Sequence, residues 1–317
     1  MREDLELEEP EFELACKLFR MGFPPLTRPQ CLPYLFGVSH QFIGYMETHS
    51  PLFYRRYEVK KVGGGVREIE APRRFLKIIQ SWINEHIFSK YNLPDCVNGF
   101  VRGKSIFSNG RAHAGKGNLM VVDIKDFFPS VKFEQVEGIF NSIGYPRSVS
   151  YQLAALCCIE GRLPQGAPTS PAIANAVFKG ADEELLTLAA QLEVNYTRYA
   201  DDLAFSGLVR FDKTHLNLVE QILHKYSFSI NDRKTRIIGR GGRQIVAGLV
   251  VNQKCLPPRS TRRNWRATFH RAENRPKEYS QRVTSLFGIA AFVNQFSPET
   301  ANKYKEIAST ILNSSKG

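Results

Sequence analysis

The chain has 317 residues, of which 43% are hydrophobic and 23% charged, so it is long enough for a sizeable core and more than one subdomain. The formal net charge of +12 and a sequence pI near 9.4 indicate a polyanionic partner, which is usually nucleic acid. No apolar run is long enough to cross a bilayer, and the acidic N-terminus lacks the basic-then-apolar order of a signal peptide, so we expect a cytoplasmic protein without a membrane partner.

Hydrophobic periodicity and glycine clusters set the elements expected in the first half of the chain. In order, they are helices at 11–22 and 39–47, a hairpin at 54–71 around Gly63 to Gly65, a long helix after Pro72, and a Gly-rich basic stretch at 98–118 with one short helix. A buried strand at 119–124, ending in an acid, closes this half of the chain.

The second half alternates helices and strands, which favours an α/β fold with helical attachments. In order, we expect helices at 131–140 and 171–192, a hairpin at 194–206, a helix at 212–226, a strand at 246–251 and helices from 259 onward. The positive charge gathers in this last segment, where residues 259–282 carry Arg259, Arg262, Arg263, Arg266, Arg271, Arg275, Lys277 and Arg282.

Acidic residues at strand ends are the candidates for chemistry. Asp123 follows the apolar strand, and Asp201 with Asp202 lies at the predicted hairpin turn. A carboxylate there is costly unless it is paired or metal-bound, and a pair of Mg²⁺ ions can be held between such acids. The alternative is that the Asp-Asp pair is simply a turn, which Asp favours. Zinc is not expected, because none of the six cysteines forms a C-x-x-C pair, and buried free thiols are expected instead.

Three strings complete a pattern in sequence order: DIKDFFPS at 123–130, LPQGAPTSP at 163–171 and YADD at 199–202. They resemble motifs A, B and C of the reverse transcriptases, and the resemblance runs from about residue 54 to the end. It implies a right-hand polymerase with fingers, a palm of antiparallel sheet plus helices, and a helical thumb. The implied segments are an N-terminal helical segment (1–53), fingers (54–118), a palm (119–255, with a fingers insertion at about 140–165) and a basic helical thumb (256–317).

The resemblance assigns the metal site. It makes Asp123, Asp201 and Asp202 the catalytic triad that holds two Mg²⁺ ions, or Mn²⁺ as a substitute, with the backbone carbonyl of Ile124 also facing the metal. Phe128 takes the steric-gate position that excludes ribonucleotides and selects dNTPs, although Phe127 and Phe128 can also both be core residues.

Further nucleotide-binding residues follow from the same resemblance. Gln165 and Gly166 belong to motif B, near the template and nucleotide. Lys234, in the motif-D-like string NDRKT, is expected near the leaving pyrophosphate. Arg67 is the candidate for a triphosphate contact from the fingers, in competition with Arg55, Arg56 and Arg73.

Two further stretches resemble the bacterial retron reverse transcriptases. Asn109-Gly110-Arg111-Ala112-His113 and Val246-Ala247-Gly248 each differ by one substitution from the N-A-x-x-H and V-T-G stretches of that family. We expect Asn109, His113, Val246 and Gly248 to contact RNA, together with Arg259, Arg262, Arg263 and Arg266. The structural alternatives are that Asn109 caps a short helix with His113 packed beside it, and that Gly248 lies where another backbone approaches.

Retron membership implies a dedicated structured non-coding RNA, priming from a guanosine 2′-hydroxyl and a branched RNA–DNA product, msDNA. It also implies an effector protein and a role in defence against phage. The alternatives are a group II intron-like, CRISPR-associated or abortive-infection reverse transcriptase, an RNA-dependent RNA polymerase, and an RNA-binding module on a catalytically inactive palm. The YADD string and Phe128 favour DNA synthesis, and the intact triad favours an enzyme.

Overall fold

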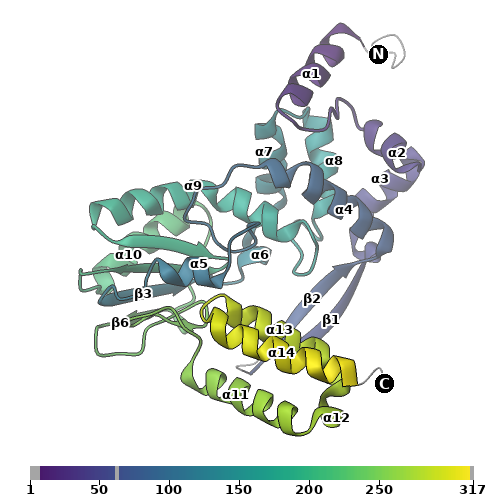
Figure 1. Ribbon diagram of the computed structural model, residues 1–317. Coiled ribbons are helices and arrows are strands. Elements are labelled where there is room, and N and C mark those ends of the chain that lie inside the picture. The colour runs from purple at the N-terminus through teal and green to yellow at the C-terminus, as the bar shows by residue number, and fades with distance from the viewer. Residues whose placement is uncertain (1–7, 61–63, 315–317) are drawn as a thin grey trace.

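The computed structural model describes residues 8–60 and 64–314. Helices at the N-terminal end lie at one extremity of the molecule, with α1 projecting from it (Figure 1). The elements up to the first strand are α1 (Glu9–Arg20), α2 (Cys31–Phe36), α3 (His40–Thr48) and the 3-10 turn η2 (Ser50–Phe53). The predicted helices at 11–22 and 39–47 are confirmed, whereas α2 was not predicted, since its six residues are too short for a periodic pattern.

A two-stranded hairpin extends from the helical layer toward the C-terminal helices (Figure 1). Its strands, β1 (Tyr54–Lys60) and β2 (Val66–Pro72), pair antiparallel, with Val59 opposite Arg67. Strand β1 is exposed at every residue after Tyr54, whereas β2 is exposed only at its first three residues. The predicted hairpin is therefore confirmed, and of its three turn glycines Gly63 lies outside the described residues.

The central sheet has four strands in the order β4-β5-β3-β6, and every neighbouring pair is antiparallel. Its strands are β3 (Asn118–Asp123), β4 (Asn195–Tyr199), β5 (Asp202–Gly207) and the unpredicted β6 (Arg236–Ile238). Alternate residues of β3 enter two different cores: Met120 and Val122 pack into the main one, Leu119 and Val121 into a smaller one. Burial on both faces explains why this strand reads as an unbroken apolar run.

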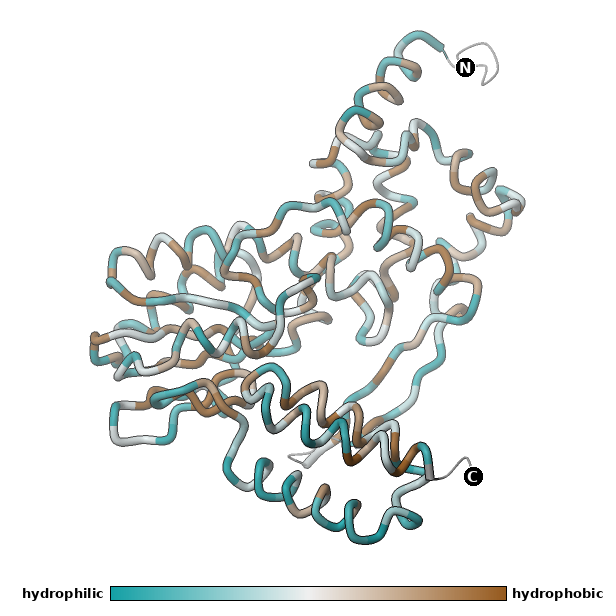
Figure 2. Tube along the Cα trace, viewed as in Figure 1, coloured by the Kyte–Doolittle hydropathy of each residue, from teal (hydrophilic) through white to brown (hydrophobic). Residues whose placement is uncertain are grey.

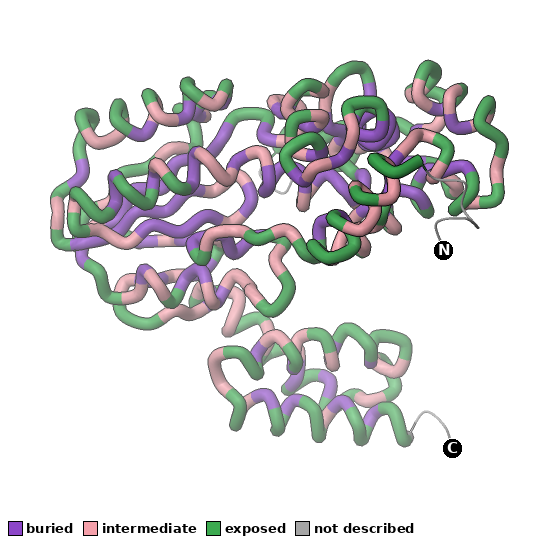
Figure 3. Tube along the Cα trace, turned by 90° about the horizontal axis from the view of Figure 1, so that it is seen from above, coloured by how far each residue is buried: buried purple, intermediate pink, exposed green. Residues whose placement is uncertain are grey.

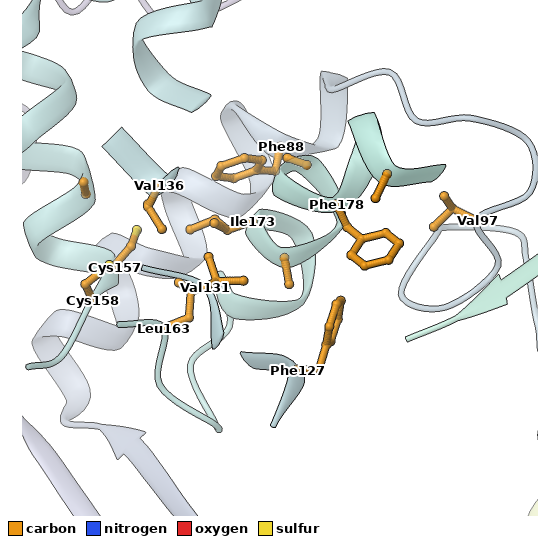
Figure 4. Packing of buried hydrophobic residues seen from close by; sticks show 14 of the residues in the cluster. Phe88, Val97, Phe127, Val131, Val136, Cys157, Cys158, Leu163, Ile173 and Phe178 are labelled. Carbon is orange, nitrogen blue, oxygen red and sulfur yellow. The ribbon is translucent and has the colours of Figure 1, made fainter. Parts of the chain in front are cut away.

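Helices cover the face of the sheet that carries the main core, which Figure 4 shows from close by with Phe127 and Phe178 facing each other. The helices of this part of the chain are α4 (Arg74–His86), η3 (Phe88–Lys90), α5 (Ile106–Arg111), α6 (Phe127–Ser130), α7 (Phe133–Ile143), α8 (Arg147–Cys157), α9 (Ser170–Gln191) and α10 (Lys213–Lys225). Helix α8, within the 140–165 segment, packs on α7 and was not predicted.

The C-terminal helices form a separate small core (Figure 3). They are α11 (Arg259–Asn274), α12 (Pro276–Tyr279), η4 (Ser280–Arg282), α13 (Val283–Asn294) and α14 (Pro298–Ser314). These helices differ in hydropathy: α11 is mainly hydrophilic, whereas α13 carries long hydrophobic stretches (Figure 2). This bundle contacts the rest of the chain at α5, where Phe107 packs on Phe292 and Phe296 and Arg111 donates to the carbonyl of Gln295 at 2.6 Å.

No helix among the described residues is both long and apolar enough to span a membrane. The chain contains six cysteines and all six are free, with Cys96, Cys157 and Cys158 buried as predicted for core thiols.

The predicted strand at 246–251 is instead a tight hairpin. Its strands are β7 (Ile245–Val246) and β8 (Leu249–Val250), joined by Ala247 and Gly248 at φ 45° and 81°. Two successive positive φ angles define the turn that joins closely paired strands. Gly248 is therefore needed for its conformation and not for a close backbone approach, because a Cβ there would meet nothing within 4 Å. Val246 is 1% exposed and packs against Leu119, so the predicted RNA contact by Val246 is wrong.

The expectation that Asn109 and His113 contact RNA is also wrong, because both side chains are fully buried. The two ring nitrogens of His113 lie 2.6 Å from the Ser206 hydroxyl and 2.7 Å from the Thr197 hydroxyl, and Thr197 donates to Asn109 at 2.6 Å. These side chains tie α5 to the central sheet. Asn109 is not the helix cap either, since Ser105 takes that position.

Both retron-like stretches therefore meet inside the protein. Helix α5 packs on β4 and on the β7–β8 hairpin, so the two stretches share one interface. Gly110 of α5 lies very close to Cys255, which follows the β7–β8 hairpin, because a Cβ at Gly110 would lie 2.6 Å from the Cys255 sulfur. Glycine in place of the family's alanine thus leaves room for Cys255.

The buried His113 predicts a pH-dependent stability. Burial lowers its pKa from 6.5 to about 4, so between these values the unfolded chain binds a proton that the folded chain excludes. The stability that the neutral ring contributes is complete above pH 6.5 and falls toward pH 4, by at most about 1.4 kcal/mol per pH unit. We expect the free-energy difference of unfolding between wild type and His113→Gln, measured by urea denaturation, to shift against wild type over this window. A difference independent of pH would contradict the assignment.

Candidate active site

The three predicted catalytic acids lie together at one end of the central sheet. Asp123 ends β3 directly opposite Asp202, the first residue of β5. Asp201 occupies the two-residue turn between β4 and β5, and its carbonyl accepts the backbone N–H of Ile124 at 2.9 Å. Asp123 is 5% exposed, and Asp201 and Asp202 are half-buried. The antiparallel register of β3 and β5 thus places Asp123 and Asp202, about 80 positions apart in the sequence, side by side.

Burial and repulsion between neighbouring carboxylates raise the pKa values of Asp201 and Asp202. Burial, followed by the charges of Asp201 and Asp123, raises the pKa of Asp202 to about 6. Burial, then the charge of Asp123, also raises the pKa of Asp201, while Lys234 and Arg67 oppose the rise. Like charges held in a poorly solvated place resist ionisation unless cations compensate them. Positive charge close to these strand ends would therefore favour the ionised carboxylates.

Lys234 supplies one such charge in the structure. Its Nζ lies 2.8 Å from Oδ2 of Asp123, and this hydrogen bond raises the pKa of Lys234. Asn231 donates to the other carboxylate oxygen at 3.0 Å, and its backbone N–H donates to the Asp123 carbonyl at 2.7 Å. Sequence reasoning singled out Lys234 from the NDRKT string but missed Asn231, which begins the same string.

The donor set suits a hard divalent cation, since carboxylate and backbone carbonyl oxygens are the ligands that Mg²⁺ and Mn²⁺ prefer. Within residues 8–60 and 64–314, no three His, Cys, Asp or Glu side chains converge as a ready metal site. At the triad, the Lys234 ammonium already bonds one carboxylate oxygen of Asp123.

A cavity of about 230 Å³ opens beside the acids. The predicted residues Ile124, Phe128, Gln165, Arg67 and Lys234 all line it, together with Asp123 and Asp201, whereas Asp202 and Gly166 do not. Sequence reasoning missed Phe100, which lines the cavity and lies 6.1 Å from Phe128 between ring centroids. Its only signal was the Asn-Gly dipeptide before it.

The two phenylalanines of motif A divide the roles that the sequence left open. Phe127 is 4% exposed and packs on Phe178 and Phe228, so it belongs to the core. Both rings line the cavity, but Phe128 is only partly buried. Of the four arginines considered for the triphosphate, Arg67 lines the cavity, while Arg56 is held by Glu70 and by Glu160 at 2.7 Å.

Gly166 has a packing role. Its φ is 139°, and a Cβ there would lie 2.9 Å from the Ile69 side chain and 3.0 Å from the Glu70 carbonyl. The preceding Gln165 carbonyl accepts the Glu70 N–H at 2.9 Å. Motif B is thereby attached to β2, which places Gln165 and Arg67 at the same cavity.

The predicted RNA-binding arginines lie on α11. Arg259, Arg263 and Arg266 are exposed, whereas Arg262 is half-buried and its Nε donates to the Pro257 carbonyl at 3.1 Å. Two neighbouring cavities, of about 580 and 440 Å³, lie along this helix. Their cationic lining residues are Arg243, Lys254, Arg259, Arg262 and Arg266, and Trp265 lines the second cavity.

Comparison with known proteins agrees with this geometry. A family model described as reverse transcriptase (RNA-dependent DNA polymerase) matches residues 59–265. The retron Mx65 reverse transcriptase of Myxococcus xanthus is 35% identical over 313 residues, covering 90% of this chain and 72% of the relative. The retron Mx162 enzyme of the same organism is 32% identical, covering 87% and 65%. The retron Ec86 reverse transcriptase of Escherichia coli is 31% identical over 78% of each chain.

The strand register that gathers the acids, the cavity beside them and these matches lead to one family. The chain belongs to the reverse transcriptases of bacterial retrons, which are RNA-directed DNA polymerases with a right-hand fold.

Proposed function

We propose that this reverse transcriptase copies a cognate structured non-coding RNA into the DNA part of msDNA by two-metal nucleotidyl transfer. The observation that carries the proposal is the pairing of Asp123 with Asp202 at adjacent strand ends, with Asp201 in the turn beside them. The name of the retron relatives supports an RNA template and a DNA product. Priming from a guanosine 2′-hydroxyl, an effector partner and defence against phage belong to the same proposal and rest on family resemblance.

In this proposal Asp123, Asp201 and Asp202 hold two Mg²⁺ ions, with the Ile124 carbonyl as a further ligand. The ions supply activation of the attacking 3′-hydroxyl and neutralisation of the leaving pyrophosphate. Lys234, displaced from Asp123, stays within reach of the cavity and neutralises or protonates the leaving group. Arg67, in the exposed first part of β2, also lines this cavity and holds the triphosphate.

The incoming dNTP occupies the cavity beside Phe128. In this proposal the Phe128 ring meets a ribose 2′-hydroxyl, and the Phe100 ring lies 6.1 Å from it between centroids. Gln165, attached to β2 through its own carbonyl, contacts the nucleotide or template base. These assignments rest on the position of the side chains around one cavity and on the family resemblance.

The α11 arginines grip the RNA by its phosphates. Guanidinium groups make bidentate, charge-assisted contacts to phosphate, and Trp265 beside them offers a surface for an unpaired base. We assign this helix to a thumb at 256–317, with an N-terminal segment at 1–53, fingers at 54–118 and a palm at 119–255. The separate core of the C-terminal helices supports the boundary between the palm and the thumb at residue 256.

The triad assignment predicts loss of synthesis on neutralising an acid. Asp201→Asn and Asp202→Asn are each expected to reduce primer extension on an RNA template to background, because each removes a metal ligand. EDTA is expected to do the same to the wild type, and added Mg²⁺ or Mn²⁺ to restore it. The measurement is extension with dNTPs, with circular dichroism as the control for folding. Near-normal extension by either folded variant would refute the assignment.

The position of Phe128 predicts relaxed sugar selection when the ring is removed. Phe128→Ala or Phe128→Val opens the space that a 2′-hydroxyl needs, so the ratio of dNTP to rNTP incorporation efficiency is expected to fall by about 10-fold or more. Phe100→Ala is the matched control, since it removes a neighbouring aromatic ring of the same cavity. An unchanged ratio in an active Phe128 variant would place the gate elsewhere.

The α11 proposal predicts a change in salt dependence. Arg259, Arg263 and Arg266 are exposed, so their replacement by alanine tests charge with little effect on packing. RNA affinity is expected to fall, and the slope of log K against log salt to flatten by about 0.7–0.9 for each phosphate that the helix no longer neutralises. Lys303→Ala with Lys305→Ala, exposed cations on α14, is the control. Weaker binding at an unchanged slope would contradict phosphate binding by this helix.

A further inference from the structure

A completely buried arginine lies behind the turn that carries the catalytic acids. Arg198 is on β4, three residues before Asp201, and its side chain is 0% exposed. A guanidinium without water must have its charge and its N–H groups matched, because an unpaired buried charge is very costly. The partners that meet this demand show what the side chain holds in place.

The guanidinium joins the turn to helix α9. Its Nε and Nη2 donate to the two oxygens of Asp182 at 2.9 and 2.6 Å, and Asp182 is also fully buried. Its Nη1 donates to the side-chain oxygen of Asn175 at 2.8 Å and to the backbone carbonyl of Ala200 at 3.2 Å. The rings of Phe178 and Phe127 lie 4.6 and 5.9 Å from the guanidinium carbon. The planar guanidinium of Arg198 therefore contacts helix α9, which begins in motif B, the Phe127 ring of motif A and the Ala200 carbonyl of motif C.

The turn itself needs such support. Ala200 has φ 57°, a left-handed conformation that non-glycine residues rarely adopt. Gly99 lies so close to it that a Cβ there would be 2.3 Å from the Ala200 nitrogen. The Gly99 carbonyl in turn accepts from Asn175 at 3.0 Å, the same side chain that accepts from Arg198. The Asn175 side chain thus bonds both Arg198 and Gly99, the two residues that contact the turn.

We propose that Arg198 is a positioning residue that fixes the Ala200–Asp201 turn through the Ala200 carbonyl and thereby sets where the carboxylates of Asp201 and Asp202 lie. Asp182 and Asn175 hold the guanidinium in the orientation that this contact requires. The inference rests on the proposed role of the triad. It goes beyond that role because Arg198 touches neither the cavity nor the acids themselves.

A purely structural role predicts a different behaviour. If the Arg198–Asp182 pair only stabilises the fold, activity per folded molecule stays constant when the pair is altered. If Arg198 positions the turn, activity per folded molecule falls even in variants that fold well. Lysine and an apolar pair separate the two cases, because lysine keeps the charge without the fork of donors, and Arg198→Met with Asp182→Leu removes both charges together.

The test uses the full chain with RNA template, DNA primer and dNTPs, at a temperature at which each variant is folded. For Arg198→Lys and for Arg198→Met with Asp182→Leu, we expect kcat per folded molecule to fall about 100-fold, the effect of a displacement of about 1 Å at a reacting centre. The KM for dNTP should stay within about threefold, because the nucleotide contacts remain. Mn²⁺ binding, followed by electron paramagnetic resonance without substrates, should weaken by about 10- to 100-fold.

Val219→Ala, a buried α10 residue in the same core, is the matched control and should lower the melting temperature while kcat per folded molecule is kept. A kcat within about threefold of wild type in either folded Arg198 variant would overturn the proposal. So would a fall no larger than that of Val219→Ala at equal melting temperature. If Asp202→Asn is also active, the triad assignment itself fails; if Asp202→Asn is inactive and Arg198→Lys is normal, only the positioning role fails.

Discussion

Repulsion among three carboxylates at adjacent strand ends is the constraint on which the rest of this structure depends. The β3–β5 register leaves Asp123 and Asp202 no freedom to separate, and the turn adds Asp201. Burial removes the water that would screen them, and so the pKa of Asp202 rises to about 6. Closely spaced, poorly solvated carboxylates ionise readily when positive charge is bound beside them, and such groups are typical of functional sites.

The surrounding residues divide the task of holding this arrangement. Lys234 and Asn231 donate hydrogen bonds to the Asp123 carboxylate, and Arg198 donates to the Ala200 carbonyl of the turn. Helices α6 and α9 contribute Phe127 and Phe178, whose rings lie over the Arg198 guanidinium. These contacts restrain the turn that carries Asp201 and hold a cation beside Asp123. Restraint of this kind is what positions reacting groups.

Most of the fold could be predicted from the sequence because its elements have strong local patterns. The 54–71 hairpin, the strand ending at Asp123 and the long helix near 171–192 were placed to within a few residues. The two wrong RNA contacts share one physical cause: a polar side chain in a sequence does not reveal whether water or protein satisfies it. Asn109 and His113 have the residue types of an RNA contact, yet Thr197 and Ser206, more than 80 positions away, satisfy them inside the fold.

The site shows the same limit. The triad and Phe128 could be located because their motifs are contiguous strings. Asn231 and Arg198 could not, because their partners, Asp123 and Asp182, come from other elements that only the fold brings near. The short β7–β8 hairpin was read as one strand, since Ala247 gives no sign that it adopts a positive φ.

We propose that Asp123, Asp201 and Asp202 form a metal site in which Lys234 gives up its hydrogen bond to Asp123. The most direct test is anomalous X-ray scattering from crystals grown with Mn²⁺, RNA–DNA primer–template and a dNTP. We expect two manganese peaks about 3.5–4 Å apart among Asp123, Asp201 and Asp202. We also expect Lys234 to have left Asp123 for the phosphates. An ordered nucleotide beside Phe128 without manganese at the three acids, or with Lys234 still paired to Asp123, would contradict it.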